Sequence, residues 1–303
     1  MSKNIKNMSA SVRTRLLKIA KDNSRNFNAV LLQYFQERLL YRLSISPYKN
    51  KFILKGALLF LVYKIPGSRP TKDIDFLGIE TANNEENLLS RMSQIVKIKV
   101  NDGVEFDPKS LTSEIIKEDE IYPGTRIHCL AYLGQAKMRF HIDIGFGDKV
   151  VPNPVMLDFP VFLMDMPVPK LIAYSPESAI AEKFEAIVNL GFTTSRMKDF
   201  FDIYHLASHQ DFELQILREA IKTTFNNRQT KLSSRLEIYS ENFINNVTKK
   251  RQWEAFIRKM RIDDDLSFQD CMSLIKKFIE PVLENFENKF WRQQDLNWII
   301  PPK

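Results

Sequence analysis

The spacing of apolar residues changes at about residue 165, and this change limits what the 303-residue chain can fold into more than any other feature. Before it, segments that read as strands alternate with segments that read as helices. Five prolines over residues 150–170 exclude a helix there and predict an extended connector. Ser175 suits a helix N-cap, and the spacing after it is helical. The sequence therefore predicts an α/β (α+β) domain over residues 1–165 and a helical domain over residues 166–303.

The first domain has the elements of a mixed sheet with flanking helices. Residues 52–64 begin as a strand and continue, after Gly56, as a buried helix. Apolar alternation at 125–133 and 137–146 predicts two strands joined by a hairpin turn, and a short strand follows from Ile74, Phe76 and Leu77. Helices are expected at residues 9–22, 27–43, 85–100, 196–208, 213–225, 229–247, 251–261 and 267–286.

Three carboxylates on two of these strands are the most informative candidates for chemistry. Asp73 and Asp75 are two residues apart, so both side chains leave one face of a strand. Asp143 lies between two isoleucines on another strand that can bring it alongside. Such like charges repel one another unless a hard cation such as Mg²⁺ or Mn²⁺ binds them, and this arrangement suits phosphoryl or nucleotidyl transfer. The alternative is that the Asp-x-Asp pair marks an exposed strand end.

Gly56 favours the catalytic interpretation. A glycine between a strand and a helix lets the backbone approach a phosphate closely, with helix N–H groups directed at it. Lys55 adds positive charge beside that turn. The Asp-x-Asp strand begins 17 residues after Gly56, so both features belong to one candidate nucleotide site.

A second cluster of charges is expected in the helical domain. Asp199 and Asp202 are three residues apart and share one helix face. Lys183, one helix earlier, can meet Asp199 across a helical hairpin. The lysine suits a triphosphate as a point charge, with a carboxylate to orient it. An ordinary interhelical salt bridge is the alternative.

Charge and cysteine content restrict the class of protein. Residues 1–50 contain ten Lys and Arg against two acids, a net charge of +8, whereas the whole chain carries +7. This excess suits RNA or DNA, although a solvated basic face is the alternative. Two cysteines without a Cys-x-x-Cys pair argue against a disulfide framework or a zinc cluster. No signal peptide or membrane span is expected, so the cytoplasm is the predicted location.

Three segments resemble the AbiEii/AbiGii-type nucleotidyltransferase toxins, the toxin half of bacterial type IV toxin–antitoxin and phage-defence pairs. The first is Phe-Ile-Leu-Lys-Gly-Ala over residues 52–57, and the second is Arg-Pro-Thr-Lys-Asp-Ile-Asp-Phe over residues 69–76. The third joins the Glu-Lys helix at residues 181–186 to the Arg-Met-Lys-Asp-Phe-Phe-Asp segment at residues 196–202. Their order and spacing make the likeness specific over residues 52–205.

The resemblance implies a nucleotidyltransferase fold, with a mixed sheet followed by a helical bundle, and it implies roles for individual residues. Asp73 and Asp75 would bind metal, Lys183 would contact the triphosphate, and Asp199 would complete the site. Candidate catalytic residues are thus Asp73, Asp75, Lys183 and Asp199, and candidate metal ligands are Asp73, Asp75 and Asp143. Candidate nucleotide-binding residues are Lys55, Gly56, Ala57, Ser68, Arg69, Thr71, Lys183 and Asp202. Ala57 departs from the usual Gly or Ser, so a phosphate contact there would come from the backbone.

The function implied is a metal-dependent transfer of NMP from an NTP to RNA, with the 3′ end of tRNA as acceptor, by a toxin that has a cognate antitoxin. The basic residues 1–50 suit an RNA acceptor. Two alternatives remain open. One is NMP transfer to a protein hydroxyl, including Thr71 or Ser68 of the chain itself. The other is a non-catalytic module that binds RNA or a protein partner.

Overall fold

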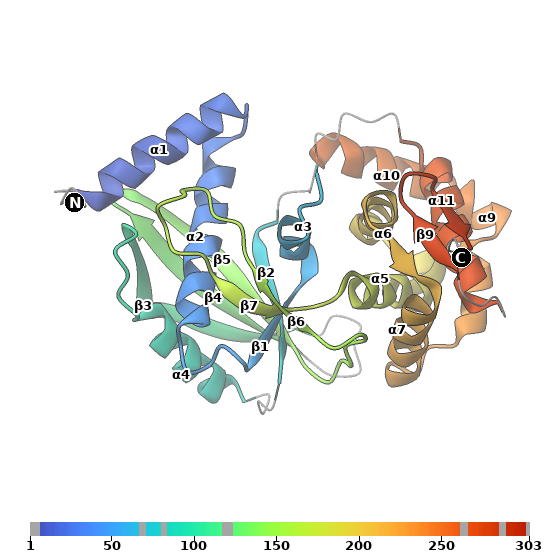
Figure 1. Ribbon diagram of the computed structural model, residues 1–303, viewed down its shortest axis with the longest axis horizontal. Helices are drawn as coiled ribbons and strands as arrows, with labels where there is room; N and C mark the ends of the chain where they lie inside the picture. Colours follow the sequence, from blue (N-terminus) through green and yellow to red (C-terminus); the bar gives the residue numbers. More distant parts are fainter. Residues whose placement is uncertain are drawn as a thin grey trace. The chain divides into compact units, whose positions relative to one another are not determined.

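The computed structural model describes residues 7–66, 71–79, 84–116, 124–260, 266–284 and 289–300 (Figure 1). The candidate residues Ser68 and Arg69 lie outside these ranges. The chain folds into two compact units. Unit 1 contains Met1–Lys64, Pro70–Gly147 and Val155–Ala173, and unit 2 contains Ile65–Arg69, Asp148–Pro154 and Tyr174–Lys303.

Unit 1 is built on a seven-stranded mixed sheet with the strand order β3-β4-β5-β2-β1-β7-β6. Neighbouring strands are antiparallel except for β2/β5 and β1/β7, which are parallel. The strands are β1 (Phe52–Lys55), β2 (Asp73–Gly78), β3 (Val104–Ile116), β4 (Gly124–Leu133), β5 (Ala136–Gly145), β6 (Val155–Asp158) and β7 (Lys170–Ala173). The predicted mixed α/β fold class is therefore confirmed.

An asparagine side chain caps the N-terminus of each of the three long helices of unit 1. The helices are α1 (Met8–Asp22), α2 (Phe27–Ser44) and α4 (Glu85–Val96), and the side chains of Asn7, Asn26 and Asn84 accept backbone N–H bonds at their N-termini. After Gly56 the chain forms a 3-10 turn, η1 (Gly56–Leu58), and the short helix α3 (Leu59–Val62). In β4 buried and half-buried residues alternate, and in β5 every second residue is less exposed than its neighbours, so one face of these strands belongs to the core.

Charged side chains of α2 are buried, which changes the meaning of the basic N-terminal segment. Arg42 forms two hydrogen bonds to the Asp102 carboxylate, at 2.7 and 3.1 Å, and both residues are buried. Arg38 is paired with Glu37 at 2.6 Å, again with both side chains buried. These arginines stabilise the fold of unit 1 and are not available to RNA. The exposed basic residues described in this segment are Arg13, Lys18, Lys21, Arg25 and Lys49.

Unit 2 is mainly helical. Its helices are α5 (Pro176–Leu190), α6 (Met197–His209), α7 (Leu214–Asn227), α8 (Arg235–Ile238), α9 (Glu241–Ile244), α10 (Val247–Met260) and α11 (Phe268–Leu283). Two 3-10 turns, η2 (Gly191–Thr193) and η3 (Leu232–Ser234), connect some of them. Ser175 caps α5 and Pro176 is its first residue, as the sequence predicts. Among the described residues, no helix combines the length and apolar character that a membrane crossing needs.

Several expectations about unit 2 and the connector were wrong. Residues 150–170 contain no helix, as expected, but they are more than a connector, because β6 and the start of β7 lie there. The helical pattern after Ser175 is interrupted by a three-stranded antiparallel sheet of β8 (Phe212–Glu213), β9 (Phe290–Arg292) and β10 (Asn297–Ile299). The single helix expected at residues 229–247 is broken into η3, α8 and α9, and the side chain of Ser240 caps α9. Strands of two to four residues are too short to give a readable period.

Candidate active site

Asp73 and Asp75 leave the same face of β2, as their spacing predicts. Both residues are half-buried, whereas Ile74 between them is fully buried. The apolar residues of β2 thus fix which face carries the carboxylates, because a strand turns successive side chains to opposite faces. Asp73 and Asp75 therefore belong to the partly exposed face of the sheet.

The strand register places Asp75 in a row of charges that crosses five strands. Asp75 lies opposite Asp143 in the parallel pair β2/β5 and opposite Lys55 in the antiparallel pair β1/β2. Beyond Asp143 the row continues with Arg126 on β4 and Glu114 on β3. A small hollow of about 80 Å³ is lined by Lys55, Asp75, Asp143 and their neighbours. The sheet therefore brings together two carboxylates that are 68 residues apart in sequence.

Gly56 lies directly against the carboxylate of Asp75. Its φ of +72° is in the left-handed region, and a Cβ built on it would stand 2.0 Å from Asp75 Oδ2 and 2.8 Å from Asp75 Cβ. Such distances are far inside van der Waals contact, so any larger residue must displace Asp75 or the backbone. The glycine is thus required at this position by both the backbone conformation and the neighbouring acid.

Arg126 binds Asp143, and this pairing bears on the predicted metal ligands. Arg126 Nε and Nη2 donate to Asp143 Oδ1 and Oδ2 at 2.8 and 2.7 Å. A forked pair of this kind already compensates the charge of Asp143. Within the described residues, no group of three His, Cys, Asp or Glu is arranged to hold a metal ion. Asp143 therefore has another partner in this conformation, and its role as a ligand stays a prediction.

Asp73 and Asp75 by themselves still fit a magnesium ion. Mg²⁺ is usually held by one or two carboxylates together with substrate phosphates, and it needs no all-protein cage. These two residues provide oxygen donors on one half-buried face, beside the turn at Gly56. These two carboxylates are therefore a donor set of the kind that holds a hard cation together with the phosphates of a bound triphosphate.

Two histidines that the sequence did not single out occupy the next row of the same face. His141 is the register partner of Asp73 in β2/β5, and His128 is that of His141 in β4/β5. Their ring centroids are 4.6 Å apart. Burial and the neighbouring His128 lower the pKa of His141. The alternation that placed Asp143 on this face also places Arg126, His128 and His141 there, so the signal was present in the sequence.

The remaining candidates of unit 1 surround the same turn. The Thr71 hydroxyl accepts a hydrogen bond from the backbone N–H of Asp73 at 3.3 Å. Ala57 is buried, with 4% of its surface exposed, so its side chain belongs to the core. Lys55 precedes Gly56 and lines the hollow with Asp75. Thr71 thus lies next to Asp73, and Lys55 lies next to Asp75.

In unit 2 the structure brings together Lys183, Asp199 and Asp202. Lys183 Nζ is 3.2 Å from Asp199 Oδ1 and 2.7 Å from Asp202 Oδ2, so this lysine of α5 meets both carboxylates of α6. Arg196 Nε donates to Asp199 Oδ2 at 2.6 Å. The expected meeting of Lys183 with Asp199 across two helices is confirmed. Two cations and two anions form a neutral cluster, in which the ammonium group is held in a fixed position.

Burial would raise the pKa of Asp199, but the positive charges of Lys183 and Arg196 outweigh that effect and lower the pKa to about 2. The usual value is 3.8, so the pairing contributes stability above pH 4 that is lost as the pH falls towards 2. We expect Asp199→Asn to lower the free energy of unfolding by about 2 kcal/mol at pH 6. Urea unfolding at pH 6, 4, 3 and 2 measures this.

The control for Asp199→Asn is Asp295→Asn, which removes an exposed carboxylate of the same unit. The control should match the wild type at every pH. The difference between wild type and Asp199→Asn should shrink between pH 4 and pH 2. A difference that stays constant over this range would show that the pairing does not lower the pKa of Asp199.

A family model and two solved structures are similar to this chain. The family model described as "Nucleotidyl transferase AbiEii toxin, Type IV TA system" matches residues 38–274. Curated proteins give no match. Among solved structures, JHP933 from Helicobacter pylori is 15% identical with a TM-score of 0.44, over 86% of this chain and 99% of that chain. A second H. pylori protein, described as a nucleotidyltransferase, is 17% identical with a TM-score of 0.43, over 86% and 100%. Both structural likenesses are loose.

Proposed function

The chain belongs to the family of AbiEii nucleotidyltransferase toxins of type IV toxin–antitoxin systems, and we propose that it transfers NMP from an NTP to the 3′ end of an RNA, with tRNA as the acceptor. Family membership implies a cognate antitoxin. We place the reaction in the cytoplasm, where NTPs and tRNA are found. The observation that supports the proposal most strongly is the contact of the Asp75 carboxylate with Gly56 beside Asp73.

In the proposed reaction the acceptor hydroxyl oxygen attacks the α-phosphorus of the NTP. A new P–O bond forms, the bond to the bridging oxygen breaks, pyrophosphate leaves, and the hydroxyl proton passes to solvent. Asp73 and Asp75 would hold the Mg²⁺ ion, which when bound neutralises the triphosphate and polarises the attacked phosphorus. Gly56 lets the phosphates approach the backbone beside Asp75, and Lys55 adds positive charge there.

The test is incorporation of each labelled NTP into total tRNA, one nucleotide at a time, with Mg²⁺ and with EDTA. We expect label in RNA for at least one NTP, and we expect EDTA to abolish it, because the carboxylates alone repel the triphosphate. Periodate oxidation of the tRNA 3′ end beforehand should also abolish it, because it destroys the acceptor diol. Label that persists in EDTA would contradict the proposed metal dependence.

Transfer to a protein hydroxyl is the second candidate, since the Thr71 hydroxyl lies 3.3 Å from the backbone nitrogen of Asp73. The same reactions, separated into RNA and protein fractions, distinguish the two acceptors. Label only in the protein fraction, lost in Thr71→Val, would establish self-modification in place of RNA transfer. No incorporation into either fraction, together with RNA binding, would leave the non-catalytic module.

A further inference from the structure

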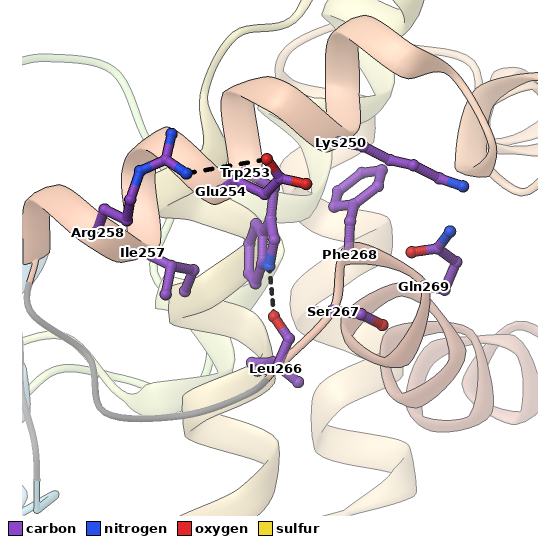
Figure 2. Close-up of a pocket in the computed structure, with 9 residues that line it drawn as sticks. All are labelled: Lys250, Trp253, Glu254, Ile257, Arg258, Leu266, Ser267, Phe268 and Gln269. Carbon is purple, nitrogen blue, oxygen red and sulfur yellow. Dashed lines mark hydrogen bonds and ion pairs between the residues drawn. The ribbon is translucent and has the colours of Figure 1, made fainter.

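Helix α10 of unit 2 packs against the start of α11 with one side and lines an open groove with another side. On the anchored side, Trp253 Nε1 donates to the Leu266 carbonyl at 2.7 Å, and the Trp253 ring packs 5.7 Å from the ring of Phe268 (Figure 2). Glu254 lies 4.0 Å from Arg258 on the same side. Trp253 is buried, so its contacts with Leu266 and Phe268 hold α10 against the start of α11. They fix the position of the residues on the other side of the helix.

The second side of α10 faces the N-terminal end of α6 across a groove of about 540 Å³. Its cations, Arg196, Lys198 and Lys259, come from both segments, and none of the described residues that line it is acidic. Phe256 from α10 contributes an aromatic ring. The described lining residues are Ser195, Arg196, Met197, Lys198, Gln252, Ala255, Phe256, Lys259 and Met260.

We propose that this groove binds a single strand of nucleic acid, with its phosphates at Lys198 and Lys259 and a base against Phe256. The inference rests on the proposed function in that it locates a site for the RNA acceptor. Both lysines are exposed, so they can reach a backbone without losing a buried structural role. A positively charged groove that contains an aromatic ring is the usual combination for sequence-tolerant binding of single strands.

Arg196 joins the groove to the cluster of Lys183. Its Nε bond to Asp199 holds the guanidinium in place at the groove, and the same Asp199 carboxylate contacts Lys183. One carboxylate therefore lies between a residue of the groove and the predicted triphosphate ligand. A strand bound in the groove is thus adjacent, within unit 2, to the residue expected to bind the NTP.

Phe256 is positioned to stack on a base. The ring is half-buried and is supported from behind by Phe201 and Trp253, at centroid distances of 5.7 and 5.8 Å. Ring support lowers the entropic cost of stacking, because the side chain is already ordered. Every nucleotide of a single strand carries both a phosphate for the lysines and a flat base for Phe256, whereas an acidic peptide needs an aromatic residue at the right position, so the groove favours nucleic acid.

The experiment is fluorescence anisotropy with a labelled RNA strand of about 12 nucleotides, within the range of known single-strand site sizes. The assay mixture contains neither NTP nor metal, so the assay measures RNA binding without NMP transfer. Lys198→Glu/Lys259→Glu should weaken binding at least about tenfold and reduce the slope of log K against log salt by about 1.4, or roughly 0.7 for each lost contact. Phe256→Leu, which keeps an apolar side chain, should weaken binding about fivefold or more without changing the slope.

The matched control is Lys222→Glu/Lys231→Glu, which reverses two exposed lysines of the same unit that do not line the groove. It should bind RNA like the wild type. Equal effects of the two double variants would overturn the groove assignment. If polyglutamate of matched charge competes as strongly as unlabelled RNA does, the ligand is an acidic protein. If an NTP competes at the same concentration as the unlabelled RNA strand, the groove is a nucleotide site. Each of these two outcomes also overturns it.

The failure of this inference is separable from the failure of the proposed function. Asp75→Asn should bind the RNA strand like the wild type, because Asp75 does not line the groove. Groove-dependent binding without any NMP transfer would keep the groove and reject the enzymatic proposal. If the charge-reversed groove variant transfers NMP and binds RNA like the wild type, the groove assignment is rejected and the enzymatic proposal is kept.

Discussion

Asp75→Asn is expected to lower NMP transfer at least about a thousandfold and to leave the fold intact. A metal-bound carboxylate contributes several kcal/mol to charge stabilisation in the transition state, and each 1.4 kcal/mol is a factor of ten in rate. Asparagine keeps the size of the side chain, so its packing against Gly56 is retained. The measurement is single-turnover incorporation of labelled NTP into tRNA, with circular dichroism to verify folding.

The matched control for Asp75→Asn is Asp158→Asn. Asp158 is also a strand carboxylate of unit 1, but it is exposed on β6 and does not line the hollow beside Asp75. It should transfer NMP at the wild-type rate. Wild-type activity in Asp75→Asn would exclude the residue as a metal ligand, and with it the proposed site.

Gly56→Ala is expected to reduce transfer by about a hundredfold and to destabilise unit 1. The positive φ costs a non-glycine residue about 1–2 kcal/mol. In addition, the alanine Cβ would collide with Asp75 Oδ2 at 2.0 Å, so the carboxylate must move away from its present position. Displacement of a catalytic group by about 1 Å can cost roughly a hundredfold in rate. Transfer rate and thermal unfolding measured on the same preparation test both effects.

Gly134→Ala separates backbone strain from the contact with Asp75. Gly134 also has a positive φ, +59°, but its nearest neighbour to a new Cβ is Ser9 Oγ at 3.3 Å. This variant should lose a comparable amount of stability through strain and keep its transfer activity. If both variants lose activity equally after correction for the folded fraction, the contact of Gly56 with Asp75 has no catalytic role.

Local sequence predicted most helices of both units and the strands that alternate regularly. Asn26 and Ser175 provide side-chain caps, so the helices they begin could be located from neighbouring residues alone. β4 and β5 alternate over ten residues each. β3 was not predicted, because it contains Pro108 and its register with β4 shifts between Asp107 and Thr112. Its strand character depends on pairing with β4, a contact between separate segments.

The candidate site was predicted unevenly for the same reason. Asp73 and Asp75 share a face through their spacing within one strand, and Asp199 and Asp202 share a face of one helix. Arg126 was missed, although it lies on the same face as Asp143, because its bond to Asp143 depends on the register of two strands. The burial of Arg38 and Arg42 was missed as well. A count of charges cannot distinguish a surface arginine from one paired inside the core.

The sequence by itself determined the elements with strong local signals, the spacing of the carboxylates, and the family of this protein. Only the tertiary structure decided the strand order, the contact between Gly56 and Asp75, the pairing of Asp143 with Arg126 and the groove between α6 and α10. The physical reason is the distance along the chain over which each interaction acts. Caps and periodicity act over a few neighbouring residues, whereas strand pairing and ion pairs in the core join residues that are distant in the chain and become neighbours only when it folds.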